Sequence, residues 1–155
     1  MKSNKIALVA ILLWVMTVAV FAWFFIRGNT VAGTDNRTVV VLGAGERNLI
    51  LGEMRGLLSG VHDILDGINR NDMQKIAQAA RAVGMASAVD VNPALLTKLP
   101  VSFKQLGMSV HRNMDDLALA AESGKSASEL QIMLTETMSK CVACHSAWQI
   151  KSDEK

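Results

Sequence analysis

An unbroken apolar stretch stands near the start of the chain. Residues Ile6 to Ile26 are apolar except for Thr17. At about 1.5 Å per residue these residues extend roughly 31 Å, the thickness of the hydrocarbon core of a bilayer. A signal peptide has a shorter apolar region, about 7–15 residues, followed by a small-residue cleavage site, and no clear site follows Ile26. The pattern predicts a retained transmembrane helix, with residues 1–27 as a membrane anchor; the alternative is a cleaved signal peptide, for which Val31-Ala32-Gly33 is a weak cleavage site.

Basic residues beside this stretch indicate its orientation. Lys2 and Lys5 precede it, whereas Arg27 alone follows it closely. This bias places the N-terminus in the cytoplasm and the rest of the chain on the other side of the membrane. Residues 28–43 begin with small and polar positions that have no helical period, which predicts a tether.

One segment mimics a nucleotide-binding turn. Val39 to Leu51 resembles a strand followed by a Gly-rich turn into a helix, but Asn48 occupies the third glycine position. We find no later segment with the alternating strands that a parallel sheet needs. We therefore interpret the segment as an apolar lead-in to a helix that starts near Ala44.

From Gly45 onward, apolar residues recur at helical spacing in four segments. The first two stripes are Ile50, Met54, Leu57, Leu58, Val61, Leu65 and Ile68, and then Met73, Ile76, Ala77, Ala80 and Val83. The last two are Phe103, Leu106, Val110, Met114, Leu117 and Ala121, and then Leu130, Leu134, Thr137, Cys141, Cys144 or His145, and Trp148. Four helices of roughly 16–25 residues with short connections predict an all-α fold, an antiparallel four-helix bundle over residues 44–155.

Capping residues mark the helix boundaries. Asn71, with Gln74 three residues later, is expected to cap the second helix, and Asp90 to Pro93 are expected to end it. A short helical turn is expected from Ala94 to Lys98. Pro100 suits the first position of the third helix, which stops at Gly124. Ser126 and Glu129 form a capping box for the fourth helix.

The composition shows that the part of the chain after the apolar stretch has few aromatic side chains to fill a core. Five of the seven aromatic residues lie in the apolar stretch, so only Phe103 and Trp148 remain from Gly28 onward. Without Lys2, Lys5 and Arg27, the rest of the chain has 13 basic and 14 acidic residues. We expect no nucleic-acid partner, because no basic patch dominates. Either aliphatic residues fill the core or a flat non-protein group does.

The chemistry rests on the sequence Cys141-Val142-Ala143-Cys144-His145, which uses both cysteines of the chain. C-x-x-C-H is the attachment sequence of c-type haem. On a helix, positions i, i+3 and i+4 share a face, so Cys141, Cys144 and His145 can meet one planar ligand. The motif predicts one haem c, bound covalently through the two cysteines, with His145 on its iron.

Two other readings of the cysteines are weaker. A thioredoxin-like pair opens a helix in a βαβ setting, whereas this pair lies near the end of the last helix. A zinc site would need His62 or His111, and those spacings match no compact zinc module. We also find no paired carboxylates and no nucleophile–base set, so hydrolase or transferase chemistry has no support.

Together, the predicted bundle and the C-terminal CVACH motif resemble the class II c-type cytochromes, that is, the cytochrome c-prime family with its low-spin, Met-ligated relatives. The resemblance covers about Gly45 to Ile150, and only the motif is specific. It implies one haem whose sixth iron position is either open, for gas binding, or filled by methionine, for electron transfer. It also implies a possible homodimer. The membrane anchor departs from the soluble members of the family.

The sixth ligand is open to three interpretations. Met54, about ten residues into the first helix and on its inward stripe, is the best placed by depth and face. His111 lies at similar depth on the third helix but flanks its stripe, and an open position is the third possibility. Arg47 or Arg55 could pair with a haem propionate, and Trp148 is expected against the haem edge.

These expectations lead to a main hypothesis and two alternatives. The main one is a mono-haem cytochrome, not an enzyme, anchored in a bacterial inner membrane with its haem domain in the periplasm. It would carry single electrons between membrane and periplasmic redox proteins, with His145 and Met54 as iron ligands. The alternatives are a five-coordinate protein that binds nitric oxide or carbon monoxide, and a haem subunit of a larger membrane redox complex.

Overall fold

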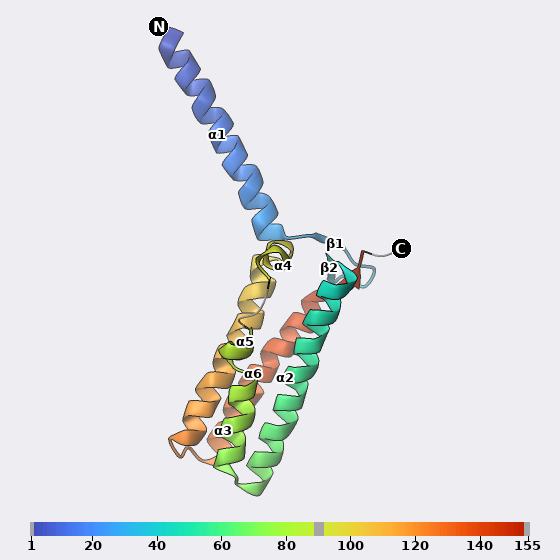
Figure 1. Ribbon diagram of the computed structural model, residues 1–155, viewed down its shortest axis with the longest axis vertical. Helices are drawn as coiled ribbons and strands as arrows, with labels where there is room; N and C mark the ends of the chain where they lie inside the picture. Colours follow the sequence, from blue (N-terminus) through green and yellow to red (C-terminus); the bar gives the residue numbers. More distant parts are fainter. Residues whose placement is uncertain (1, 89–91, 154–155) are drawn as a thin grey trace.

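The computed structural model describes residues 2–88 and 92–153. Figure 1 shows a mostly helical molecule with one long helix projecting from it. The helices are α1 (Lys2–Arg27), α2 (Ala44–Arg70), α3 (Met73–Ala82), the 3₁₀ turn η1 (Met85–Ala88), α4 (Pro93–Lys98), α5 (Val101–Glu122) and α6 (Ala127–Ala147). The strands are β1 (Thr30–Ala32), β2 (Thr38–Leu42) and β3 (Trp148–Ser152).

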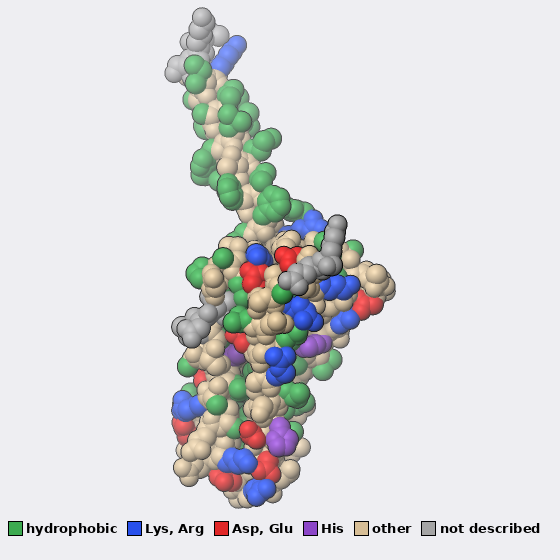
Figure 2. Space-filling model, turned by 45° about the vertical axis from the view of Figure 1, so that its right-hand side comes forward, with side chains coloured by type: hydrophobic (Ala, Val, Ile, Leu, Met, Phe, Trp, Pro, Cys, Tyr) green, Lys and Arg blue, Asp and Glu red, His purple; other side chains and the backbone are tan. Residues whose placement is uncertain are grey.

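Helix α1 is the predicted apolar helix. Its segment Asn4–Arg27 has a mean hydropathy of 2.6, and none of it is buried within the molecule. Figure 2 shows it as a rod of hydrophobic side chains that extends beyond the domain. It is long and apolar enough to cross a membrane.

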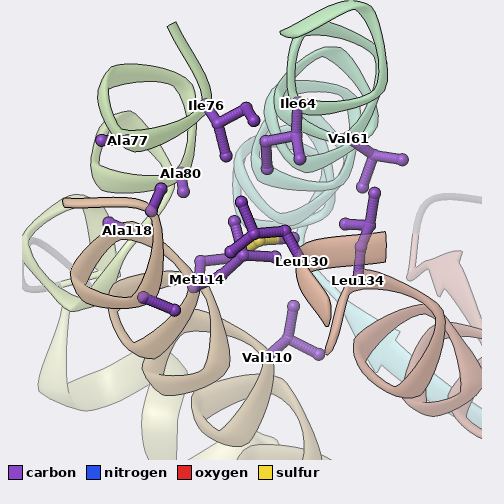
Figure 3. Close-up of a cluster of buried hydrophobic side chains, with 13 residues drawn as sticks. Val61, Ile64, Ile76, Ala77, Ala80, Val110, Met114, Ala118, Leu130 and Leu134 are labelled. Atoms are coloured by element: carbon purple, nitrogen blue, oxygen red, sulfur yellow. The ribbon is translucent and has the colours of Figure 1, made fainter. Parts of the chain in front are cut away.

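The main core lies where α2, α3, α5 and α6 pack together (Figure 3). Ile64 of α2, Ile76 of α3, Met114 of α5 and Leu130 of α6 have no exposed surface there. Each of these helices buries the apolar stripe that its sequence carries, because removing that surface from water is favourable by about 25 cal/mol per Å². Aliphatic side chains alone fill this core.

Helix α3 is shorter than the sequence predicted. It has 10 residues and ends at Ala82, whereas helices of roughly 16–25 residues were expected. A carboxylate of α5 accounts for the early end, since Asp115 accepts a hydrogen bond from the backbone N–H of Met85 at 2.9 Å. This contact bends the chain into η1. Asp90, which was expected to help end this helix, lies outside the described residues.

The cap before α3 is shifted by one residue. Asn71 has a φ of 54° and closes α2, while Asp72 caps α3 by accepting from the backbone N–H of Lys75. The predicted Asn71 cap is therefore wrong, because a residue in the left-handed conformation ends a helix rather than beginning one. The Ser126–Glu129 capping box of α6 and the short helix α4 are confirmed.

A small three-stranded sheet corrects two expectations. Strand β2 lies in the middle, antiparallel to β1 and parallel to β3. The fold is therefore not purely α, and residues 28–43 are not an irregular tether. Val40 and Leu42 of β2 are buried against α2, α4 and α5, in a second core cluster with Ile50, Leu95, Leu99 and Phe103.

The link between α1 and the sheet is held against the domain. Gly28 has a φ of 65°, and a Cβ atom there would lie 2.5 Å from the carbonyl oxygen of Lys98. The next residue, Asn29, donates its backbone N–H to that same oxygen at 2.7 Å. The ammonium of Lys104 on α5 lies 4.3 Å from the ring centre of Phe25 on α1. Glycine is required at this junction because the two backbones approach so closely.

Candidate functional site

The C-x-x-C-H motif occupies the last two turns of α6. Its capping box starts the helix at Ala127, and the helix ends at Ala147, two residues after His145. Cys141 and Cys144 are free thiols and half-buried, while His145 is exposed at the end of the helix. The last turns of α6, which carry all three residues, lie at the end of the domain that also carries the sheet (Figure 1).

A cavity of about 560 Å³ lies against the motif. It is a half-open cavity bordered by parts of α2, α4, α5 and α6, and most of its wall is aliphatic. All of the predicted site residues line it, including both alternatives for the sixth ligand: Met54, His111, Cys141, Cys144 and His145. Residues that span 92 positions of sequence are thus brought to one chamber.

A smaller cavity of about 170 Å³ adjoins the same residues on the side of the sheet. Met54, Cys144 and His145 line both cavities, whereas His111 lines only the larger one. Met54 and Cys144 also pack on the second core cluster. Met54 therefore shares both cavities with His145, whereas His111 shares only the larger one.

The two thiols are not poised for redox exchange with other thiols. Burial raises the pKa of Cys141 and of Cys144, so both are protonated at neutral pH. They also lie at the C-terminal end of α6, where the helix dipole opposes a thiolate, whereas thioredoxin-like pairs open a helix. The arrangement disfavours disulfide exchange.

The imidazole of His145 is available as a ligand. Among the described residues, its ring has no hydrogen-bond partner; only its backbone carbonyl is engaged, accepting from the guanidinium of Arg37 at 3.3 Å. The ring of His111 is 7% exposed, and its Nδ1 lies 2.9 Å from the carbonyl oxygen of Val83. Nδ1 must donate to that carbonyl, which fixes the His111 ring against the turn after α3.

Charged residues accompany the apolar wall of the large cavity. Arg55, Lys104 and Lys140 line it, whereas Arg47 does not. Glu53 is the acidic residue among those lining it. The pKa of Glu53 is raised, because the effect of burial exceeds the opposite effect of the nearby His111. The cavity is therefore apolar with basic groups beside it, a combination suited to an amphipathic ligand with acidic groups.

Trp148 does not continue the stripe of the last helix, as the sequence suggested. It is the first residue of β3, because pairing with β2 turns the chain into an extended conformation after Ala147. Its ring meets Phe103 edge-on with centroids 5.8 Å apart, beside the smaller cavity. The two aromatic residues of the domain thus lie together at the site.

Sequence reasoning missed several residues of the site. Arg37 and Gln149 line the smaller cavity because β2 and β3 pair, and Leu96 and Leu99 line the larger one from the α4 corner. The alternation of Trp148-Gln149-Ile150-Lys151-Ser152 was a signal for a strand, although a short one. Nothing local to Arg37 pointed to the site.

No cluster of three or more His, Cys, Asp or Glu side chains suited to a metal ion occurs within residues 2–88 and 92–153. His62, one histidine that a zinc site could have used, is 81% exposed and contacts Asp63 instead.

Comparison with known proteins adds no relative: no protein-family model, curated protein or solved structure matches the chain.

Proposed function

We propose that the chain is a membrane-tethered, mono-haem c-type cytochrome that carries single electrons. Haem c would be bound through Cys141 and Cys144, with His145 and Met54 on its iron. The observation that carries the proposal is that these four residues line one cavity of about 560 Å³. In the sequence, the motif and Met54 were separate features.

The architecture supports a bundle of the class II cytochrome type. In this proposal α2, α3, α5 and α6 are its four antiparallel helices, and α1 and the sheet are additions that the family resemblance did not imply. The antiparallel course of α5 and α6 follows from two hydrogen bonds, Asn113 to Thr137 and Lys140 to the carbonyl of Ser109. The CVACH motif then lies at the end of the bundle where α2 and α5 begin.

The cavity suits a haem group in size and lining. Small-molecule sites usually enclose about 300–1,000 Å³ and are mostly apolar with a few polar groups. Arg55, Lys104 and Lys140 supply cations for the propionates, and Arg47, the other arginine considered, does not line the cavity. When bound, haem would supply reversible one-electron chemistry at its iron.

Register favours Met54 over His111 as the second iron ligand. Continuing the Asn113–Thr137 and Ser109–Lys140 pairs along α5 and α6 puts His145 level with about Gln105. His111 is six residues further along α5, roughly 9 Å at helical rise. The His111 ring is also held by the carbonyl of Val83, whereas Met54 lines both cavities together with His145.

If His145 and Met54 both held the iron, no ligand position would be left for a substrate. A thioether is a neutral, soft donor that raises the reduction potential. The role of these residues is therefore to hold the iron in one geometry in both oxidation states. Electron transfer needs nothing more from them.

The location follows from α1. We propose that it spans a bacterial inner membrane with its N-terminus in the cytoplasm, leaving the haem domain in the periplasm. Attachment to the membrane limits the search for partners to its surface, which raises the effective concentration of membrane redox proteins. Membrane and periplasmic redox proteins are the proposed partners.

Absorption spectra of the full chain, made in cells that attach haem c, test the proposal. We expect low-spin ferric and ferrous spectra, a weak near-infrared sulfur-to-iron band, and no response of the ferrous form to carbon monoxide. A high-spin ferrous spectrum that shifts fully with carbon monoxide would contradict electron transfer and favour the gas-binding alternative.

A further inference from the structure

The near balance of charge along the sequence conceals a separation in space. We call "membrane end" the half of the domain that holds the sheet, α4, the first halves of α2 and α5, and the last two turns of α6. Figure 2 shows Lys and Arg side chains gathered on this part, next to α1. Two of its acids, Asp35 and Glu46, are in ion pairs with Arg37 and Lys98, and Glu53 and Asp153 also lie at this end. Basic side chains of this end without an ion pair among the described residues are Arg27, Arg47, Arg55, Lys104, Lys140 and Lys151. Of these, Arg27, Arg47 and Lys151 do not line the large cavity and are not assigned to the propionates.

The other half of the domain has the opposite balance. Four of its cations, Arg70, Lys75, Arg81 and Lys125, are in ion pairs with three acids, because Arg70 and Lys75 share Asp66. Asp63, Asp72, Asp115, Asp116 and Glu136 form no ion pair with Lys or Arg within the described chain, and Arg112 forms none with an acid. This half is therefore net negative, and the membrane end is net positive.

Helix α1 leaves the domain from the positive end. The contacts of Phe25 with Lys104, and of Gly28 and Asn29 with Lys98, hold the end of α1 against α4 and α5. If α1 spans a bilayer, these contacts set the membrane end beside the lipid headgroups. The charge there then matters, because an anionic surface attracts basic groups within a Debye length of about 8 Å at physiological salt.

We propose that the membrane end is a docking surface for anionic phospholipid headgroups, and that it sets the orientation of the domain on the membrane. The inference rests on the proposed span of α1 and does not depend on haem. It deepens the proposed function, because the part of the cavity that Lys104 and His145 line then lies toward the bilayer. The far, acidic half is held away from the same surface by like-charge repulsion.

Lysine labelling of the full chain in nanodiscs tests this orientation. Lys151 on β3 reports on the membrane end, and Lys125 at the start of α6 reports on the far half; both are exposed. Each is acetylated with an amine-reactive ester, and the rates are read by mass spectrometry. In nanodiscs with phosphatidylglycerol, compared with phosphatidylcholine alone, Lys151 should react several-fold more slowly and Lys125 at an unchanged rate. About 1 M salt should remove the difference, since it shortens the screening length to about 3 Å.

Two matched variants localise the effect. Arg47→Glu, at the membrane end, should restore much of the Lys151 rate in anionic nanodiscs, whereas Arg112→Glu, the same change in the far half, should leave it unchanged. Equal Lys151 rates in both lipids, or equal slowing of both lysines, would overturn the proposal. A chain that does not co-purify with nanodiscs would overturn the span and this inference together. The haem spectrum of the same sample tests the cytochrome proposal separately.

Discussion

Two methionines give the sharpest comparison at the scale of single residues. Met54 and Met108 both line the large cavity, but only Met54 also lines the small one beside His145. Each can be changed to leucine at a cost of less than about 1.5 kcal/mol, because the side-chain volume is conserved. The pair therefore separates iron ligation from core packing.

We expect Met54→Leu to turn the low-spin protein into a high-spin form that binds carbon monoxide. Its reduction potential should fall, because the thioether that favours ferrous iron is gone. Spectra and a redox titration measure both effects, and Met108→Leu should match the parent protein. If the Met54→Leu protein kept the spectrum and the reduction potential of the parent, Met54 would not be the iron ligand and another side chain would have to be.

The sequence predicted the individual site residues unevenly. Cys141, Cys144 and His145 follow from a local motif, and Met54 from its depth and face on a helix. Arg37 and Leu96 could not be predicted, because they reach the cavities only through contacts between segments distant in sequence. The exposure of Leu58, which the helical period placed on the inner stripe, is 69%. The helical spacing of apolar residues alone does not show that Leu58 borders a cavity instead of packing in the core.

At the scale of elements, local signals predicted the helices and failed for the strands. The Ser126–Glu129 box begins α6 because its hydrogen bonds join neighbours three positions apart. Strand β2 instead pairs with β3, with Val40 opposite Ile150, so its partner lies at the other end of the domain. Short strands of this kind carry little periodic signal of their own.

The sheet is expected to be part of the stable fold. Leu42 is 1% exposed and packs in the second core cluster with Ile50, Leu95 and Phe103. Leu42→Ala should therefore lower the free energy of unfolding by about 2–5 kcal/mol, the cost of truncating a buried leucine. Denaturant unfolding of the full chain in detergent measures it.

Val31→Ala on the edge strand β1 is the matched control. Val31 is 50% exposed, so its truncation should cost less than about 0.5 kcal/mol. Equal, small effects of the two changes would mean that the sheet adds little to the fold, and that Arg37 is not held over His145 by a stable element.

At the scale of the whole molecule, the scarcity of aromatic residues acquires a physical meaning. Aliphatic side chains fill the core between α2, α3, α5 and α6, and Phe103 and Trp148 pack together at the site. The wall of the large cavity is apolar but encloses about 560 Å³. A covalently held haem would complete this second part of the core, so cofactor attachment and folding are expected to be coupled.

The central claim is that Cys141 and Cys144 hold one haem. Intact mass spectrometry of the denatured full chain, produced with and without a haem-attachment system, tests it most directly. We predict that the mass rises by one haem only when the system is present, and that Cys141→Ser with Cys144→Ser abolishes the gain. A colourless parent chain with the mass of its amino acids alone, from cells in which another c-type cytochrome matures normally, would contradict the account.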